Sequence, residues 1–166
     1  ITNGNSPTTQ SSSGDWTPPT MAVIGARIIV THPGFPGGAT KFGVIDISTP
    51  SAPTWAATDC ATQALSAVPR AVANFFNRAY FAVNQYLEYT DVLDPLTRTN
   101  ATQVLTVGDT SIITALSGLP VQTSSSGIVG ALLAFKGFSV WQITGDHDAN
   151  IGTGIGHSIE DFAEAC

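Results

Sequence analysis

Three strand-turn-strand patterns, repeated at a nearly constant spacing, constrain the fold of this chain more than any other feature. The clearest spans 77–94 (NRAYFAVNQYLEYTDVLD), where an apolar run and an aromatic, β-branched run flank the connection Asn84-Gln85. Two-residue hairpin turns favour residues that tolerate a positive φ, and Asn is one of them. The segment therefore predicts a β-hairpin.

Two weaker copies of this pattern occur elsewhere. One spans 130–146 with Lys136-Gly137 as its turn, and a looser one spans 26–48 with a Pro/Gly-rich loop between its strands. The starts lie 51 and 53 residues apart, close to the roughly 50-residue period of one family of propeller blades; they are Ala26, Asn77 and Gly130. We expect an all-β chain of propeller-like antiparallel meanders, part of a larger or oligomeric β-propeller, with a β-sandwich as the alternative.

The composition divides the chain into three segments. Residues 1–20 are rich in Thr, Ser, Asn, Gly and Pro and predict an extended arm or linker anchored by Trp16. Residues 21–146 hold the β-repeats. Residues 147–166 are Gly-rich and then acidic, and their Ser158–Ala165 stretch, with Asp161 at capping-box spacing, predicts a brief helix.

Shorter elements are expected between the hairpins. A strand within 70–76 leads into the central hairpin and makes a three-stranded meander, and 104–107 offers another strand. An extended connection is expected over 49–57 and a weak helical turn over 59–66. Gly118-Leu119-Pro120 is expected to break the chain between strands.

The charge of the chain argues against nucleic acid as a partner, and its apolar runs are too short for membrane insertion. Charged residues make up 11% of the composition, against roughly 25% in typical soluble domains, and the formal net charge is −6. Such a chain is not expected to clamp the phosphates of a nucleic acid. No window approaches the roughly 18 consecutive apolar residues of a membrane span, so no membrane insertion by this segment is expected.

The two cysteines, Cys60 and Cys166, do not form a disulfide framework. A buried or terminal free thiol is favoured. A bond between them would require an oxidising compartment, and the sequence leaves that open.

Glu88, Asp91 and Asp94 could supply the paired carboxylates of a glycoside hydrolase. Ordinary structure explains them better. Asp91 is expected to start a turn, Asp94-Pro95 is common turn chemistry, and Glu88 is expected on the solvent face of an alternating strand.

Other polar groups in the C-terminal part resemble sites only weakly. Asp146, His147, Asp148 and Asn150 could offer oxygens to Ca²⁺, but the remaining positions of a calcium loop are missing, so a turn is preferred. His157 and Asp161 could lie on one helical face, yet no particular serine is tied to them. Gly152–Gly156 lacks the strand and helix of a phosphate loop.

Two surface features remain. Asn100-Ala101-Thr102 matches a glycosylation sequon, which matters only in a secreted eukaryotic protein. Trp16, Trp55 and Trp141 could line a sugar platform, although aromatic residues in strands more often pack in a core or an interface. We therefore assign no catalytic, cofactor-binding or metal-binding residue, and expect no enzyme and no cofactor.

Three phrases of the sequence resemble a known family. They are 77–82 (NRAYFA), 90–95 (TDVLDP) and 135–146 (FKGFSVWQITGD). This pattern looks like that of the tail nozzle and packaged-DNA stabilisation (tail tubular) proteins of short-tailed phages, in their propeller region. The resemblance covers about 68–146 well and is moderately specific.

The resemblance implies a structural virion protein of the phage tail. Such a subunit would form a ring with copies of itself, line or close the DNA exit channel and attach to the tail adaptor or portal, with double-stranded DNA only as passing cargo. Family members are much longer than this chain, and a closed propeller needs roughly four to eight blades. The resemblance thus implies a fragment or a ring completed by other copies, and the start at Ile1 instead of Met fits processing or a longer protein. The alternative is a carbohydrate- or receptor-binding β module of a tail or extracellular protein, with Trp16, Trp55 and Tyr86 exposed together.

Overall fold

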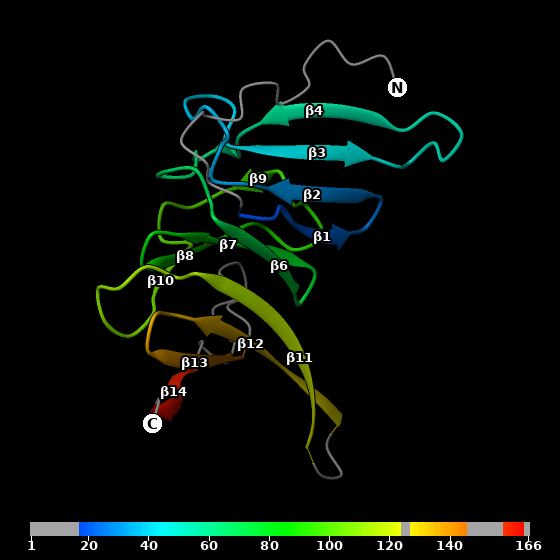
Figure 1. The fold of residues 1–166 in the computed structure, drawn as a ribbon. Coiled ribbons are helices and arrows are strands. Elements are labelled where there is room, and N and C mark those ends of the chain that lie inside the picture. Colours follow the sequence, from blue (N-terminus) through cyan, green and yellow to red (C-terminus); the bar gives the residue numbers. More distant parts are fainter. Residues whose placement is uncertain (1–16, 124–126, 146–157, 165–166) are drawn as a thin grey trace.

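The chain folds into three four-stranded antiparallel sheets that follow one another in sequence (Figure 1). The computed structural model describes residues 17–123, 127–145 and 158–164, and these ranges contain fourteen strands and no helix. The predicted all-β class is confirmed. Most of the predicted arm at 1–20 lies outside the described residues.

Each of the three sheets is a meander whose strands pair in chain order. Sheet 1 consists of β1 (Thr20–Ile24), β2 (Arg27–Thr31), β3 (Phe42–Asp46) and β4 (Thr54–Thr58). Sheet 2 consists of β6 (Ala71–Phe75), β7 (Arg78–Val83), β8 (Tyr86–Tyr89) and β10 (Val104–Thr106). Sheet 3 consists of β11 (Ala115–Thr123), β12 (Gly127–Phe135), β13 (Ser139–Thr144) and β14 (Ser158–Glu164). A short parallel ribbon joins β5 (Ala61–Thr62) to β9 (Thr97–Arg98).

The three predicted hairpins are the middle strand pairs of these sheets. Their first strands begin at Arg27, Arg78 and Gly127, which lie 51 and 49 residues apart. The central turn is confirmed, with Asn84 at a φ of 55°. The turn of the third hairpin is longer than predicted, because Ser139 begins β13 and Phe138, 89% exposed, belongs to the turn.

The opening strands of the three sheets lie side by side, with β6 in contact with both β1 and β11. The link between β1 and β6 is made by side chains. The Asn74 amide donates to the Val23 carbonyl at 2.7 Å, and the Val72 backbone N–H donates to Thr20 Oγ1 at 3.0 Å. On the other side, a Cβ added to Gly118 of β11 would lie 3.4 Å from the Asn74 carbonyl, so the two strands approach closely. The strand β1 was not anticipated.

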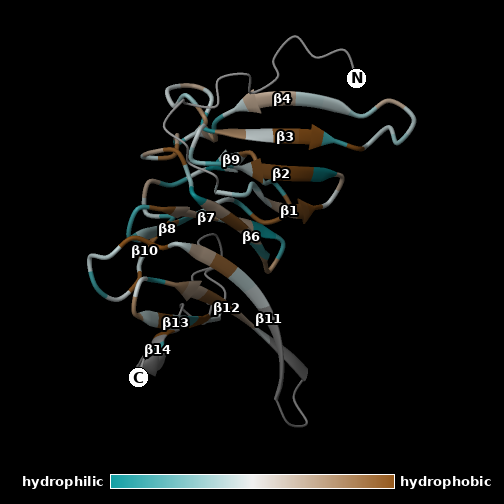
Figure 2. Cartoon of the chain, viewed as in Figure 1, coloured by the Kyte–Doolittle hydropathy of each residue, from teal (hydrophilic) through white to brown (hydrophobic). Residues whose placement is uncertain are grey.

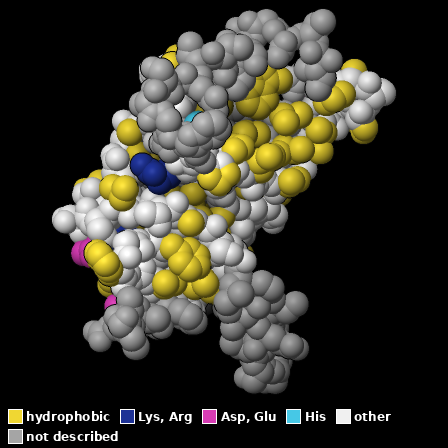
Figure 3. Space-filling model, in the orientation of Figure 1, with side chains coloured by type: hydrophobic (Ala, Val, Ile, Leu, Met, Phe, Trp, Pro, Cys, Tyr) yellow, Lys and Arg dark blue, Asp and Glu magenta, His cyan; other side chains and the backbone are white. Residues whose placement is uncertain are grey.

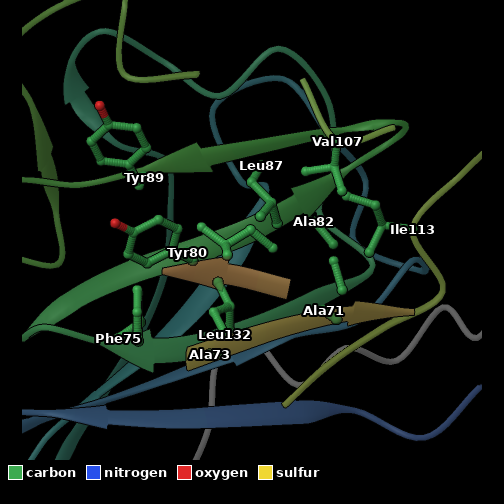
Figure 4. Close-up of a cluster of buried hydrophobic side chains, with 12 residues drawn as sticks. Ala71, Ala73, Phe75, Tyr80, Ala82, Leu87, Tyr89, Val107, Ile113 and Leu132 are labelled. Atoms are coloured by element: carbon green, nitrogen blue, oxygen red, sulfur yellow. The ribbon is translucent and has the colours of Figure 1, made fainter. Parts of the chain in front are cut away.

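Sheet 2 is the middle layer and is buried on both faces. Every residue of β7 is buried, because alternate side chains enter two different cores. The core shared with sheet 1 includes Phe42 and Phe81, whose ring centroids are 4.9 Å apart. In the core shared with sheet 3, Tyr80 stacks on Tyr89 at 5.2 Å (Figure 4). The hydropathy colours of Figure 2 show apolar stretches in strands of both sheets that flank the first core.

Four of the shorter elements differ from expectation. The segment Ser158–Glu164 is a strand, not a helix, because it pairs along β13, and an isolated helix of this length would be marginal. Gly118-Leu119-Pro120 lies inside β11 instead of breaking the chain; β11 is at the edge of its sheet, where Pro is tolerated. The expected connection over 49–57 overlaps β4, and the expected helical turn over 59–66 contains β5, whose Thr62 has a φ of 66°.

Candidate functional site

A buried ion pair lies beside sheet 2, where the loop after β4 and the loop after β8 meet. The Arg98 guanidinium donates from Nη1 to Glu88 Oε2 at 2.6 Å, and both side chains are buried. The backbone N–H of Ser66 donates to both Glu88 oxygens at 3.2 Å, and its hydroxyl also donates to the carboxylate. The prediction that Glu88 faces solvent is therefore wrong.

The arginine of this pair ties three chain segments together. Arg98 Nη1 also donates to the Ala64 carbonyl at 2.8 Å, and Arg98 Nη2 donates to the Gln103 carbonyl at 3.4 Å. Arg98 Nε, by contrast, has no hydrogen-bond partner. A buried charge costs several kcal/mol unless it is paired, so Glu88 and Arg98 must be placed together for these loops to close over sheet 2.

The other two acids of the proposed carboxylate group act in turns, as predicted. The Asp91 carboxylate accepts from Gln103 Nε2 at 2.8 Å and from the Thr99 hydroxyl. Asp94 Oδ1 accepts from the Leu96 backbone N–H at 3.2 Å. The backbones of Asp91 and Asp94 form an isolated antiparallel β-bridge across the turn. All three acids are thus engaged in contacts that shape the fold.

The thiol of Cys60 is buried next to this network. Burial, followed by the nearby carboxylate of Asp59, raises the pKa of the Cys60 thiol to about 12. Asp59 in turn holds the turn, since its Oδ1 accepts from the backbone N–H groups of Cys60 at 2.7 Å and Leu65 at 3.0 Å. A thiol with this pKa stays protonated at neutral pH and is a poor nucleophile. Cys166 lies outside the described residues.

Residues of the first two phrases that carry the family resemblance contact each other, and a residue of the third contacts a neighbouring loop. Arg78, from the first phrase, donates to the Thr90 carbonyl at 3.0 Å, and its guanidinium lies 5.9 Å from the centroid of the Tyr89 ring. The Thr90 hydroxyl accepts from the Ala79 backbone N–H at 3.0 Å. From the third phrase, Lys136 donates to the Asp109 carbonyl in the loop between sheets 2 and 3. These residues fasten strands and loops.

The tryptophans are packed in the fold to different degrees. Trp141 lies against Gly108, where an added Cβ would come within 2.2 Å of the indole, and it packs on the core between sheets 2 and 3. Trp55 is half-buried on β4 of sheet 1, whereas Tyr86 belongs to β8 of sheet 2. The alternative requires Trp55 and Tyr86 to form one exposed platform with Trp16, and Trp16 lies outside the described residues.

The remaining sequence candidates fall mostly outside the described ranges. These are Asp146, His147, Asp148, Asn150, Gly152–Gly156 and His157. Asp161 is exposed on β14. Within the residues that the structure describes, no three His, Cys, Asp or Glu side chains gather as a metal site.

The outward face of sheet 1 is a feature that sequence analysis missed. The strand register places eight side-chain positions on the side of the sheet turned away from sheet 2, and all eight are apolar or Gly: Met21, Val23, Ile28, Val30, Gly43, Ile45, Trp55 and Ala57. We call this set the outer face. Met21 is 61% exposed and Val23 is 55% exposed. The available signal was that, within 21–30, alternate residues on both sides of the chain are apolar or Gly except for Arg27.

The indole of Trp55 lies against Gly43 on this outer face. A Cβ added to Gly43 would come within 2.0 Å of the ring, so only Gly fits beneath it. Figure 3 shows hydrophobic side chains gathered at the sheet 1 end of the molecule. Contiguous exposed apolar surface of this kind is typical of an interaction site.

Comparison with known proteins adds no relative: no protein-family model matches the chain, and no characterised protein and no solved structure matches it either. In the described ranges, no helix is long and apolar enough to cross a membrane.

Proposed function

We propose that this chain is a structural β-repeat subunit of a phage tail, of the nozzle type. The observation that carries the proposal is the stack of three four-stranded meanders, with opening strands side by side and hairpins about 50 residues apart. In a β-propeller, successive four-stranded sheets are arranged radially around a central channel. Each sheet is proposed to be one blade, and copies are proposed to assemble in a ring with the tail adaptor or portal.

The contacts of the candidate site favour a structural role over a chemical one. Glu88, Asp91 and Asp94 accept hydrogen bonds that close loops, and the Cys60 thiol stays protonated at neutral pH. The residues that resemble the tail family, such as Arg78 and Thr90, likewise fasten one strand to the next. The net charge of −6 suits the wall of a channel along which DNA slides without binding.

Electron microscopy of the purified chain tests this proposal. Ring-shaped particles with an open centre are expected. A fluorescently labelled DNA duplex should show no rise in anisotropy even at low ionic strength, where phosphate contacts are strongest. A saturable, salt-sensitive complex with DNA, or the absence of rings at every concentration, would count against the tail role.

The carbohydrate-binding alternative is tested by the same preparation. Titration of the tryptophan fluorescence with a panel of glycans should leave the emission unchanged if the chain is a tail wall. A saturable change that disappears in Trp55→Phe would favour the binding module, because Trp55 is the described tryptophan on an open face.

A further inference from the structure

We propose that the outer face of sheet 1 binds the same face of a second copy of this chain, sheet upon sheet, about a two-fold axis. The inference goes beyond the tail role and would stand without it. A two-fold contact is compatible with a ring that is built through other surfaces, as in dihedral assemblies.

The first argument is continuity with the packing inside the chain. Sheets of this protein bury their apolar faces against one another, and sheet 2 does so on both sides. Sheet 1 does so on one side only, through Ala22, Ile29 and Val44. Its other side carries only apolar residues and Gly and is not covered by the other described sheets. A second sheet packed on it would extend the same stack, at the roughly 10 Å spacing of facing sheets.

The second argument is charge. None of the eight outer-face positions carries a charge, and the charged residues of sheet 1 point elsewhere. Arg27 and Asp46, for example, pair at 4.0 Å at the side turned toward sheet 2, where Arg27 also reaches Asp94 at 3.4 Å. In a chain of net charge −6, two outer faces can meet without bringing like charges together.

The third argument concerns which surface of the second copy is available. The far side of sheet 3 is the other candidate for stacking. It already buries Ala131 and Leu133, and its β13 positions include the polar Gln142 and Thr144. The outer face of sheet 1 is uniformly apolar and open at Met21 and Val23. It is therefore self-complementary, which is what a two-fold contact requires.

A matched pair of double variants tests the interface by light scattering coupled to size-exclusion chromatography. Met21→Lys with Val23→Lys introduces two charges on the outer face, and Val92→Lys with Leu93→Lys introduces the same charges at a turn. The replaced residues match in type and exposure: Val92 is 44% exposed and Leu93 is 65% exposed. The outer-face variant should halve the mass of the wild-type particle, because each two-fold contact joins two copies, while the turn variant should keep the wild-type mass.

A wild-type particle that contains an odd number of copies, or one whose mass the outer-face variant leaves unchanged, would overturn the proposal. So would a decrease by a factor other than two, because a head-to-tail contact would then be involved. Far-ultraviolet circular dichroism confirms that both variants are folded.

A measurement on the wild-type chain needs no disruptive variant. The emission of Trp55 is the difference between the emission of the wild-type chain and that of Trp55→Phe. Acrylamide should quench this emission less as the protein concentration rises, because Trp55 becomes covered on association. Quenching that does not depend on concentration would contradict the interface. Rings that keep the full wild-type mass in the outer-face variant would remove this interface and leave the tail role standing. Halving of a particle that forms no ring would do the reverse.

Discussion

Sheets 1 and 2 are both four-stranded meanders, yet their surroundings differ. Sheet 2 has a core on each face and a buried ion pair at Glu88 of its inner strand β8, whereas sheet 1 has one core and one open apolar face. Because both faces of a strand in a stack must be apolar, both sheets show near-continuous apolar runs in the sequence. An apolar run in the sequence therefore indicates that both faces of a strand can pack against another sheet. Only the arrangement of the sheets shows which face is packed within the chain.

The largest expected difference comes from truncating one apolar side chain in each environment. Phe81→Ala deletes a fully buried ring that packs on Phe42 between the two sheets, and should lower the free energy of unfolding by about 4 kcal/mol. Val23→Ala on the outer face, measured at a concentration where the chain is monomeric, should change it by less than about 1 kcal/mol. Urea denaturation followed by circular dichroism measures both. Equal losses would show that the open face is packed within the monomer.

Breaking the buried ion pair should have the next largest effect. Arg98→Met leaves the Glu88 carboxylate buried beside Ser66 without its cation, and should cost about 3 kcal/mol or more. The double variant Glu88→Gln with Arg98→Met removes both charges and should recover part of that loss. The same denaturation measurements on the two single variants and the double variant complete a double-mutant cycle, which gives the coupling free energy between Glu88 and Arg98. A double variant as unstable as the sum of the single variants would indicate that the two residues act independently.

The sequence predicted the hairpins well because their signal is local. The turn at Asn84 and the runs around it need only neighbouring residues to specify a hairpin. The strand β14 was missed because its partner β13 decides its conformation, and a capping-box spacing at Ser158 carries no information about that partner. The burial of Glu88 was missed for the same reason, since its neutralising partner Arg98 comes from the short strand β9, outside sheet 2.

The ionisation of Cys60 provides a smaller effect, which depends on pH. Burial raises the pKa of the thiol from 9.0 to about 12 in the folded state. The unfolded chain therefore loses its proton first, so the stabilisation is complete below about pH 9 and decreases by up to roughly 1.4 kcal/mol per pH unit above it. Urea denaturation between pH 8 and pH 11 should show this slope in a Cys166→Ser background. The added substitution Cys60→Ser should abolish it, and an unchanged slope would assign the effect to other groups.

The smallest expected effect belongs to the half-exposed ion pairs of Arg27, one within sheet 1 and one to the turn after β8. Arg27 reaches Asp94 at 3.4 Å and Asp46 at 4.0 Å, but more than a third of each side chain is exposed to solvent. Arg27→Met should therefore lower the free energy of unfolding by less than about 1 kcal/mol, and less still in high salt, because water and ions screen exposed pairs. Arg98→Met is the matched substitution in the buried environment, and its cost should hardly change with salt. If the two substitutions cost the same and respond equally to salt, burial does not distinguish the ion pair of sheet 2 from those of sheet 1. The contrast between the two sheets would then be confined to their apolar faces.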